Sequence, residues 1–417
     1  MPRSCLNPFM FQNSNYVTLT VNTVPNGATI TFNTGKISGN TCTVRAGTVV
    51  GYTVTYSGLE SVTGSITMIQ NITMTVNMHY AGGIVFLDSS SAGTQNIQSR
   101  VVDVYCNIIC VGGGGGGAGR LLVSIVAAAA GGGSGGYSNA DVILPTSITQ
   151  ATVGSAGGST TSQGGGTSQA SGGGTSSVGS LVSATGGGGG YVKAQNSSPT
   201  MTGGARGTGT TSNGNAGGTK KITSGSGTAN GGASVYNGRG LGASINVYTG
   251  SKPSVKTAST TGYVKITSKT LTDYLLTVNV PAGVNLTLTS AGHTQAGNAI
   301  RVSPNTDVTY VLSKVGYIPL TNTFRITTDT VLNLDDELVP IPLTVLNCGP
   351  LIEVSQIRNA GLIASAVSTT KDAGSIAGTV DITKDAGAIF SFPVSPEVLD
   401  MGLVTEAVEE TIDCEQI

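Results

Sequence analysis

The chain has 417 residues, of which 63 are glycine and only 10% are charged. An ordinary soluble domain contains roughly 7% glycine and about 25% charged residues. The 20 basic and 21 acidic residues nearly balance, which argues against a nucleic-acid binder that depends on electrostatics. With no tryptophan and 2 histidines, the composition also argues against a typical acid–base enzyme.

Composition varies along the chain and divides it into four zones, 1–80, 81–268, 269–334 and 335–417. Residues 111–250 hold 42 of the 63 glycines but only seven charged residues. The longest apolar run is about half of the ~20 residues that a membrane-spanning helix needs, so we expect no membrane insertion. The N-terminal residues lack the apolar stretch of a secretory signal, so we expect the cysteines to be reduced.

The first zone has the pattern of short strands. Val, Ile and Leu alternate with Thr and Asn, which is typical of strands that bury one face. The third zone repeats this pattern, with a Pro-Ala-Gly turn in place of Pro-Asn-Gly. We therefore predict an all-β protein in which two small β-sandwiches, at 1–80 and 269–334, flank a glycine-rich domain at 81–268. The matching segments are Thr18-Leu-Thr-Val-Asn-Thr-Val-Pro-Asn-Gly-Ala-Thr-Ile-Thr-Phe32 and, with one deletion, Leu275-Leu-Thr-Val-Asn-Val-Pro-Ala-Gly-Val-Asn-Leu-Thr-Leu288.

These two segments resemble PEGA-type domains, which are small immunoglobulin-like β-sandwiches. The resemblance rests on the Leu-Thr-Val strand, the Pro-x-Gly turn and a later Gly-Tyr element. Val315-Gly316-Tyr317 supplies that element in the second copy, whereas Leu59 stands at the tyrosine position in the first. The resemblance implies a fold and almost nothing about chemistry.

Cys106 and Cys110 lie four residues apart on a predicted strand and therefore share one face. We interpret them as two small buried apolar groups. A metal site would need more Cys or His residues at ligand spacing, and the sequence offers none nearby.

Ordering the glycine-rich zone has a large cost in conformational entropy. Each ordered glycine costs about 0.5–1 kcal/mol more than an alanine. A flexible linker avoids that cost, whereas an ordered zone without side chains needs dense main-chain hydrogen bonds. We predict polyglycine-II-like threads, with polyproline-II geometry, that approach closely enough to bond one another. Strands at 141–144, 151–153 and 262–267 would frame them. No helix follows any glycine run, so we expect no nucleotide cofactor.

The order of landmarks in this zone resembles the glycine-rich domain of bacteriophage tail-fibre and tail-adhesin proteins. A strand runs into a glycine stretch, and the zone ends in a Gly-Tyr-Val strand. The run Leu121–Ala130 departs from that pattern and is either an added strand or a contact between subunits. The resemblance implies recognition of a host-surface polymer by loop tips. The landmarks are Ile108-Ile-Cys-Val-Gly-Gly-Gly-Gly-Gly-Gly117, Gly135-Gly-Tyr-Ser-Asn-Ala-Asp-Val-Ile-Leu-Pro145, Ala151-Thr-Val-Gly-Ser-Ala-Gly-Gly158, Gly186-Gly-Gly-Gly-Gly-Tyr191 and Gly262-Tyr-Val-Lys-Ile-Thr267.

The last zone is acidic and repetitive, with 14 of the 21 acidic residues and a net charge of −11. A unit of about 13 residues cannot bury a core by itself. We therefore predict an elongated array, either a three-chain stem or a docking segment that lies along a partner. One Asp in a unit fits a turn residue better than a calcium ligand. The repeats are Asn359-Ala-Gly-Leu-Ile363, Asp372-Ala-Gly-Ser-Ile376, Asp385-Ala-Gly-Ala-Ile389, Asp400-Met-Gly-Leu-Val404 and Asp413-Cys-Glu-Gln-Ile417.

The sequence contains no catalytic signature around His79 or His293. We predict no catalytic, cofactor-binding or metal site. Four tyrosines punctuate the glycine-rich zone and could stack on sugars at loop tips, although packing against the glycine threads is the simpler interpretation. These weak candidates for receptor binding are Tyr137, Tyr191, Tyr236 and Tyr248.

Taken together, these features predict a structural component of a bacteriophage virion, assembled in the host cytoplasm, with a tail fibre or appendage favoured over a capsid position. A capsid decoration or head-fibre protein would have the same parts. A cellular surface adhesin would need a secretion signal or an anchor, and a depolymerase would need paired carboxylates that 81–268 lacks.

The expected partners are further copies of the chain, other virion proteins and a host-surface polysaccharide or protein. We favour a homotrimer, because glycine-rich strands expose backbone edges that closed symmetry would cover. We expect neither nucleic acid nor a membrane as a partner.

Overall fold

The computed structural model describes residues 16–123, 126–194 and 198–334, Leu338, and the backbone of two short strands further along. Every regular element in these residues is a β-strand, which confirms the all-β prediction. The two short strands, β33 (Ile363–Ser365) and β34 (Ser375–Ala377), pair in parallel. The rest of the predicted acidic array lies outside the described residues.

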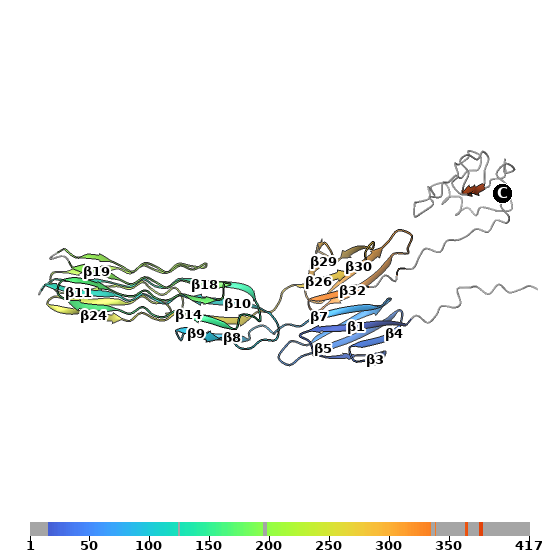
Figure 1. The fold of residues 1–417 in the computed structure, drawn as a ribbon, viewed down its shortest axis with the longest axis horizontal. Helices are drawn as coiled ribbons and strands as arrows, with labels where there is room; N and C mark the ends of the chain where they lie inside the picture. Colours follow the sequence, from blue (N-terminus) through green and yellow to red (C-terminus); the bar gives the residue numbers. More distant parts are fainter. Residues whose placement is uncertain are drawn as a thin grey trace, which may run out of the picture. The chain divides into compact units, whose positions relative to one another are not determined.

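The segments 16–77 and 274–334 join edge to edge in the same two sheets (Figure 1). Their strands alternate buried and exposed residues, as the period-2 pattern predicts. The eight-stranded sheet has the order β28 (Gln295–Ala296), β29 (Ala299–Val302), β26 (Tyr274–Asn279), β32 (Thr330–Leu334), β7 (Ile72–Asn77), β1 (Tyr16–Val24), β4 (Thr41–Arg45) and β3 (Lys36–Ser38). The six-stranded sheet has the order β2 (Thr29–Phe32), β5 (Thr48–Thr55), β6 (Val62–Met68), β31 (Leu320–Ile326), β30 (Thr306–Ser313) and β27 (Asn285–Thr289).

Both sheet orders are palindromic with respect to the sequence repeat. In the first sheet β7 meets its own counterpart β32, and in the second β6 meets its counterpart β31. The register places equivalent residues opposite one another, since Met74 pairs with Leu332 and Ile66 with Phe324. The two copies are therefore related by a local two-fold, as in an isologous dimer built within one chain.

The same hydrogen bonds recur in both copies. The Thr18 N–H donates to Asn71 Oδ1 at 2.8 Å, and the Leu275 N–H donates to Asp329 Oδ1 at 2.6 Å. Asn40 and Asn298 also occupy matching places, where each donates its side-chain amide to an asparagine at the end of the Leu-Thr-Val-Asn strand. The repeat read from the sequence thus extends to individual polar contacts.

The glycine-rich domain enters and leaves this β-sandwich at one place. The Gly83 N–H donates to the Ser268 carbonyl and the Ser268 N–H donates to the Ile84 carbonyl, both at 2.8 Å. Thr270 lies directly against Gly82. The domain is therefore an insertion between the two copies, with its two connections side by side.

The part of the glycine-rich domain next to these connections is a two-layer β-sandwich. One layer has the order β13 (Tyr137–Leu144), β10 (Val104–Val111), β25 (Tyr263–Ser268) and β8 (Val85–Ser89). The other has the order β18 (Val182–Ala184), β17 (Ser176–Val178), β14 (Gln150–Val153) and β9 (Gly93–Asn96). The predicted strands at 141–144, 151–153 and 262–267 are thus confirmed as parts of β13, β14 and β25, although β13 begins four residues earlier than predicted and the bounds of the other two differ by one residue.

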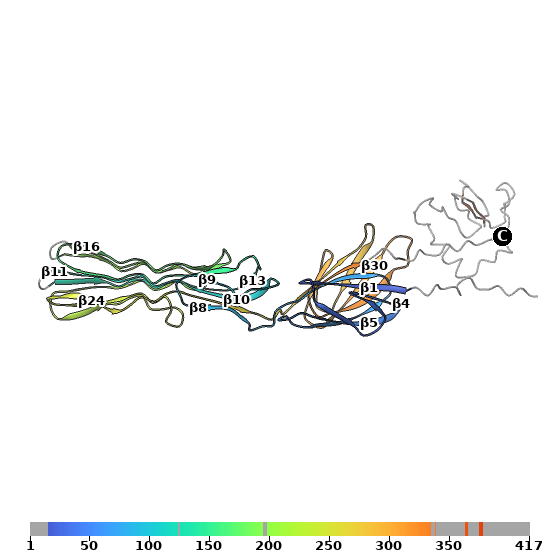
Figure 2. The same cartoon turned by 60° about the horizontal axis from the view of Figure 1, so that its bottom comes forward.

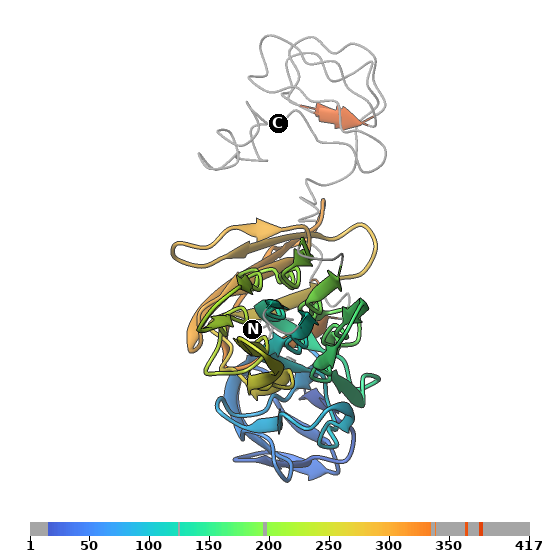
Figure 3. The same cartoon turned by 90° about the vertical axis from the view of Figure 1, so that its left-hand side faces the viewer.

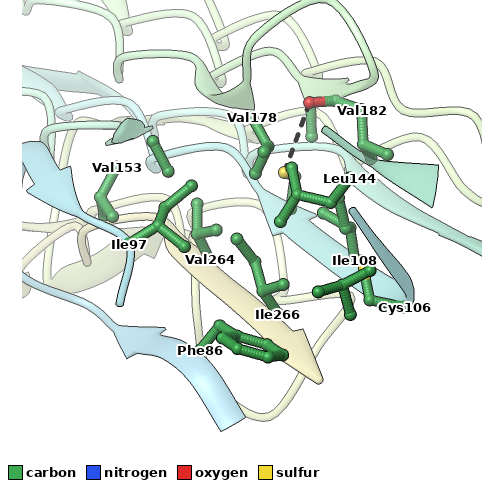
Figure 4. Packing of buried hydrophobic residues seen from close by; sticks show 14 residues of the cluster. Phe86, Ile97, Cys106, Ile108, Leu144, Val153, Val178, Val182, Val264 and Ile266 are labelled. Atoms are coloured by element: carbon green, nitrogen blue, oxygen red, sulfur yellow. Dashed lines mark hydrogen bonds between the residues drawn. The ribbon is translucent and has the colours of Figure 1, made fainter. Parts of the chain in front are cut away.

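Apolar side chains from both layers fill the space between them (Figure 4). Cys106 and Cys110 are fully buried in this core among Phe86, Ile266 and Val182, which confirms their interpretation as apolar groups. The Cys110 thiol lies 3.5 Å from the Val182 carbonyl. Burial raises the pKa of Cys106 to about 11 and that of Cys110 to about 12, so both thiols stay protonated at neutral pH.

Glycine threads run onward from these strands and bond one another through their backbones, as predicted. In thread 112–117, two pairs of donors three residues apart each reach a single neighbour, whereas Gly117 donates to Ser159 Oγ and not to the neighbour of Gly114. This period matches the three residues per turn of a polyproline-II helix. Gly112 and Gly115 donate to thread 131–136, Gly113 and Gly116 to thread 171–174, and Gly114 to Thr260.

The carbonyls of thread 112–117 accept from a second set of neighbours, 154–160, 185–190 and 240–243. Thread 131–136 is surrounded in the same way by neighbours on every side. These two central threads therefore pack as in a hexagonal array. The bonds are Gly157 to Gly114, Thr160 to Gly117, Gly187 to Gly113, Gly190 to Gly116 and Ala243 to Gly115, each N–H to carbonyl at 2.8–2.9 Å.

Candidate functional site

The threads end in a set of strand pairs at one end of the glycine-rich domain, which we call the distal hairpins. Three of them are paired strands, namely β11 (Ala118–Val123) with β12 (Val126–Ala130), β19 (Tyr191–Ala194) with β20 (Thr200–Thr202), and β23 (Ser244–Tyr248) with β24 (Ser251–Thr257). The other two are consecutive strands that lie in neighbouring sheets, namely β15 (Thr160–Gln163) with β16 (Gly166–Gln169), and β21 (Thr219–Ile222) with β22 (Ser226–Ala229). Figures 1 and 2 show β11, β16, β19 and β24 at this end and β8 and β10 at the other, and Figure 3 views this end face on.

The distal hairpins form three layers. The sheet β15-β11-β12-β21 lies in the middle, between β16-β19-β20 and β22-β23-β24. Strand β12 is buried on both faces, so Ala128 and Ala130 pack with Val192 while Ala127 and Ala129 pack with Ile245. Small side chains allow both outer layers to come close. The apolar run Leu121–Ala130 is thus an added pair of strands at the centre of the layers.

Arg120 on β11 holds the turn between β15 and β16. Its guanidinium is buried and has no carboxylate among the hydrogen-bond partners that the structure gives it, which are all oxygens of residues 162–168. A buried cation is tolerable only when its donors are satisfied. Nε donates to the Gly164 carbonyl at 2.6 Å, and the terminal nitrogens donate to the Thr167 carbonyl at 2.8 Å, to Ser162 Oγ at 2.9 Å, to Ser168 Oγ at 3.2 Å and to the Gly165 carbonyl. The result is a fixed positive charge beneath the turn.

Exposed lysines surround the distal hairpins, and the sequence has no acidic residue between Asp141 and Asp273. The acidic residues of the domain lie instead on or beside the strands at its other end, where Asp141 pairs with Lys269 at 2.6 Å and Asp88 with Lys265 at 3.6 Å. The charged residues that the structure describes on the distal strands are therefore all basic. The exposed lysines of these strands are Lys193, Lys220, Lys221, Lys252 and Lys256.

The structure separates the four candidate tyrosines into two places. Tyr248 ends β23 at the distal hairpins, where it is 40% exposed and its hydroxyl accepts from the Asn246 amide at 3.1 Å. Tyr191 begins β19 and is half-buried. Tyr137 and Tyr236 lie at the other end of the threads. Of the four, only Tyr248 presents an exposed ring near a hairpin turn.

Tyr236 stacks between Tyr137 and Tyr263, and Tyr263 was not among the candidates from the sequence. Ring centroids are 5.1 Å and 5.8 Å apart along this column, and the Arg239 guanidinium lies 5.4 Å from the Tyr263 centroid. Burial, and then the Asp88 carboxylate, raise the pKa of Tyr263 above its ordinary value. Since the Tyr236 ring has a tyrosine neighbour on each side, the column is a packing feature rather than a platform for sugars.

Arg120 and the distal lysines were missed because charge averaged over a whole zone conceals a local cluster. The signal was present, since the long stretch without Asp or Glu contains several lysines. What the sequence does not indicate is that distant hairpins, from 118 to 257, gather at one end. Their grouping depends on where each glycine thread reverses direction. A run of identical glycines does not indicate that position.

Within the described part of the chain, no group of three His, Cys, Asp or Glu residues is placed to hold a metal ion. His79 lies 3.4 Å from Asp329 and stacks on Tyr274, and both neighbours belong to the β-sandwich. The described residues also include no helix long and apolar enough to cross a membrane.

Comparison with known proteins identifies the central part of the chain. No curated protein matches it significantly. A sequence model of the glycine-rich domain family matches residues 89–303, just over half of the chain. The matched residues run from the end of β8 through β29, so they include every glycine thread and all the distal hairpins. The chain therefore belongs to the glycine-rich domain family.

Proposed function

We propose that the protein is a structural component of a bacteriophage virion, namely a tail fibre or tail adhesin that attaches the particle to the host surface. The observation that carries this proposal is the thread bundle, in which backbone bonds repeat every three residues around 112–117. Such a bundle is stiff without a side-chain core, and it is well suited to hold hairpins rigidly at one end. The order of landmarks described above supports the same conclusion.

The proposal includes the two flanking segments as PEGA-like domains. Each supplies one half of the β-sandwich and repeats the other's hydrogen bonds, as two copies of one domain would. It also includes a homotrimer. Because threads 112–117 and 131–136 find their partners within one chain, the subunit contacts would lie on outer threads, strand edges or the acidic zone.

Immunogold electron microscopy tests the proposal. Antibodies against residues 84–268 should label a tail appendage of intact virions and should block their adsorption to host cells, and mass photometry should give a trimer of the purified chain. Labelling of the capsid would establish the head-fibre alternative instead. Absence of the protein from purified virions would refute a virion role altogether.

A further inference from the structure

We propose that the distal hairpins bind an anionic polysaccharide, a surface glycan that carries phosphate or carboxylate groups. This inference rests on the proposed function and specifies the chemistry of the partner. It starts from the uneven charge of the glycine-rich domain, whose acidic residues and distal lysines lie at opposite ends.

The lysines next to the β-sandwich are neutralised, whereas three exposed lysines of the distal hairpins lie on strands without an acidic residue. Lys269 and Lys265 have carboxylate partners on neighbouring strands. Lys193, Lys252 and Lys256 are exposed on strands that contain no Asp or Glu at all. Several like charges on one rigid end produce a field that attracts an oppositely charged polymer and raises its rate of association.

The positions of the lysines suit an extended ligand. Lys252 is the second residue of β24, which begins after the turn at 249–250, and Lys193 is the third of the four residues of β19. Lys252 and Lys256 are four residues apart on β24, an edge strand, so their Cα atoms are separated by at most roughly 13 Å. Charges spread in this way can each meet a different repeat unit of one chain.

Arg120 adds a positive charge whose position is fixed by its hydrogen bonds. Its donors are saturated by the turn at 162–168, so it does not itself grip a ligand. It therefore keeps the turn between β15 and β16 in one conformation, which lowers the entropy cost of binding.

The neighbouring groups favour a polysaccharide over a nucleic acid. Tyr248 and Asn246 lie beside the turn at 249–250, and both can form hydrogen bonds with sugar hydroxyls. Non-specific binding of single-stranded nucleic acid uses a basic groove with several stacking aromatics. Here Tyr248 is the one exposed aromatic side chain among the distal strands that the structure describes. Lysine ammonium groups suit point-like phosphate or carboxylate charges.

The test measures binding of the purified full-length protein to fluorescein-labelled alginate, a carboxylate polymer, by anisotropy. Neutral dextran of equal length and single-stranded DNA of equal charge serve as comparison probes. We expect alginate to bind, dextran not to bind and DNA to bind more weakly. Raising NaCl from 50 to 200 mM should weaken alginate binding about tenfold, as ion release requires.

Matched triple variants locate the surface. Lys193→Gln with Lys252→Gln and Lys256→Gln should weaken alginate binding about tenfold or more. Lys36→Gln with Arg45→Gln and Arg301→Gln removes the same charge from exposed sites of the β-sandwich and should change binding less than twofold. All six positions are exposed, and unchanged thermal unfolding would show that both variants fold.

Two results would overturn the inference: equal binding of dextran and alginate, or equal losses in the two triple variants. Tighter binding of DNA than of alginate would assign the surface to nucleic acid. Cell-attachment assays on the same variants separate this inference from the proposed function. If the distal variant still attaches to host cells, attachment stands and the polyanion inference fails, whereas loss of virion labelling refutes the proposed function regardless of the alginate result.

Discussion

At the scale of single residues, the glycine-rich domain distinguishes glycines that face other threads from glycines that face solvent. A Cβ atom added at Gly115 would run into the carbonyl of Gly188, which is backbone and cannot rotate away. A Cβ atom added at Gly218 would meet Asn230 only at an ordinary contact distance of 3.5 Å. Both residues donate a backbone hydrogen bond. The two positions therefore differ only in the space that is available for a side chain.

Alanine substitution should separate these two classes. Gly115→Ala should lower the free energy of unfolding by about 1–3 kcal/mol or more, because the methyl group forces two threads apart. Gly218→Ala is the matched control and should change stability by less than about 1 kcal/mol, in the stabilising direction, because alanine restricts the unfolded chain. Urea denaturation measures both values. Equal effects at the two sites would contradict close packing of the threads.

The sequence could predict the threads but not which glycines face inward. Ordered glycine without side chains implies main-chain bonding, and that argument led to the correct local geometry. However, an unbroken run such as Gly112 to Gly117 hides its own period of three, because every position has the same residue. Only the neighbours in space reveal that Gly112 and Gly115 point the same way.

At the scale of elements, the turns before β7 and β32 perform one task with different residues. Asn71 accepts the Thr18 N–H, whereas Asp329 accepts the Leu275 N–H and also lies beside His79. Burial raises the pKa of Asp329, but His79, the Leu275 N–H and Arg301 together outweigh it and hold the pKa below its ordinary value. A carboxylate of this kind stabilises the fold at neutral pH.

Asp329→Asn keeps the acceptor for Leu275 and removes the charge, as Asn71 does in the other copy. A lowered pKa means that the stabilisation is complete above the ordinary carboxyl pKa of about 4 and is lost as the pH falls below it. We therefore expect the variant to be less stable by about 1 kcal/mol at pH 7, and the difference to shrink towards pH 2–3. Urea denaturation at both pH values measures it. Parallel pH profiles for the two proteins would show that Asp329 carries no linked proton.

Element identity was predictable where the side chains alternate and obscure where they do not. Strands such as β1, β10 and β26 show period 2, and the structure confirms them. Strand β12 reads as a short alanine-rich run that could suit several structures, and its burial on both faces explains why it shows no alternation. Short polar strands such as β15 and β16 have no apolar face from which the sequence could predict them.

At the scale of the whole molecule, the candidate site could be predicted only in part. Loop tips were expected to matter, and Tyr248 does lie beside one. The other tyrosines were chosen because they interrupt glycine runs, and that criterion cannot tell a stacked column from an exposed ring. The grouping of the distal lysines depends on contacts between segments that are far apart in the sequence, which no local pattern contains.

The insertion of the glycine-rich domain into the β-sandwich leads to a prediction about autonomy. Replacing residues 83–269 by a short Gly-Ser linker should leave a folded β-sandwich, because Gly82 and Thr270 are already adjacent. Circular dichroism should show a β spectrum and a cooperative thermal transition.

The matching control is residues 1–82 alone, in which β6 and β7 lose their partners β31 and β32. That fragment should show no cooperative transition. If it unfolds cooperatively, each copy is an independent domain and the local two-fold is not needed for stability. If the linked sandwich itself fails to fold, the insertion contributes to the core of the sandwich.

The three-residue period of the thread bonds restricts how this domain can change in length. One extra residue in a thread would rotate everything beyond it by a third of a turn, so each N–H would point at the wrong neighbour. A full extra turn in one thread alone would leave the peptide groups of that turn without hydrogen-bond partners on the neighbouring threads. The domain can therefore grow or shrink only in steps of about 9 Å, with three residues added or removed in every thread together.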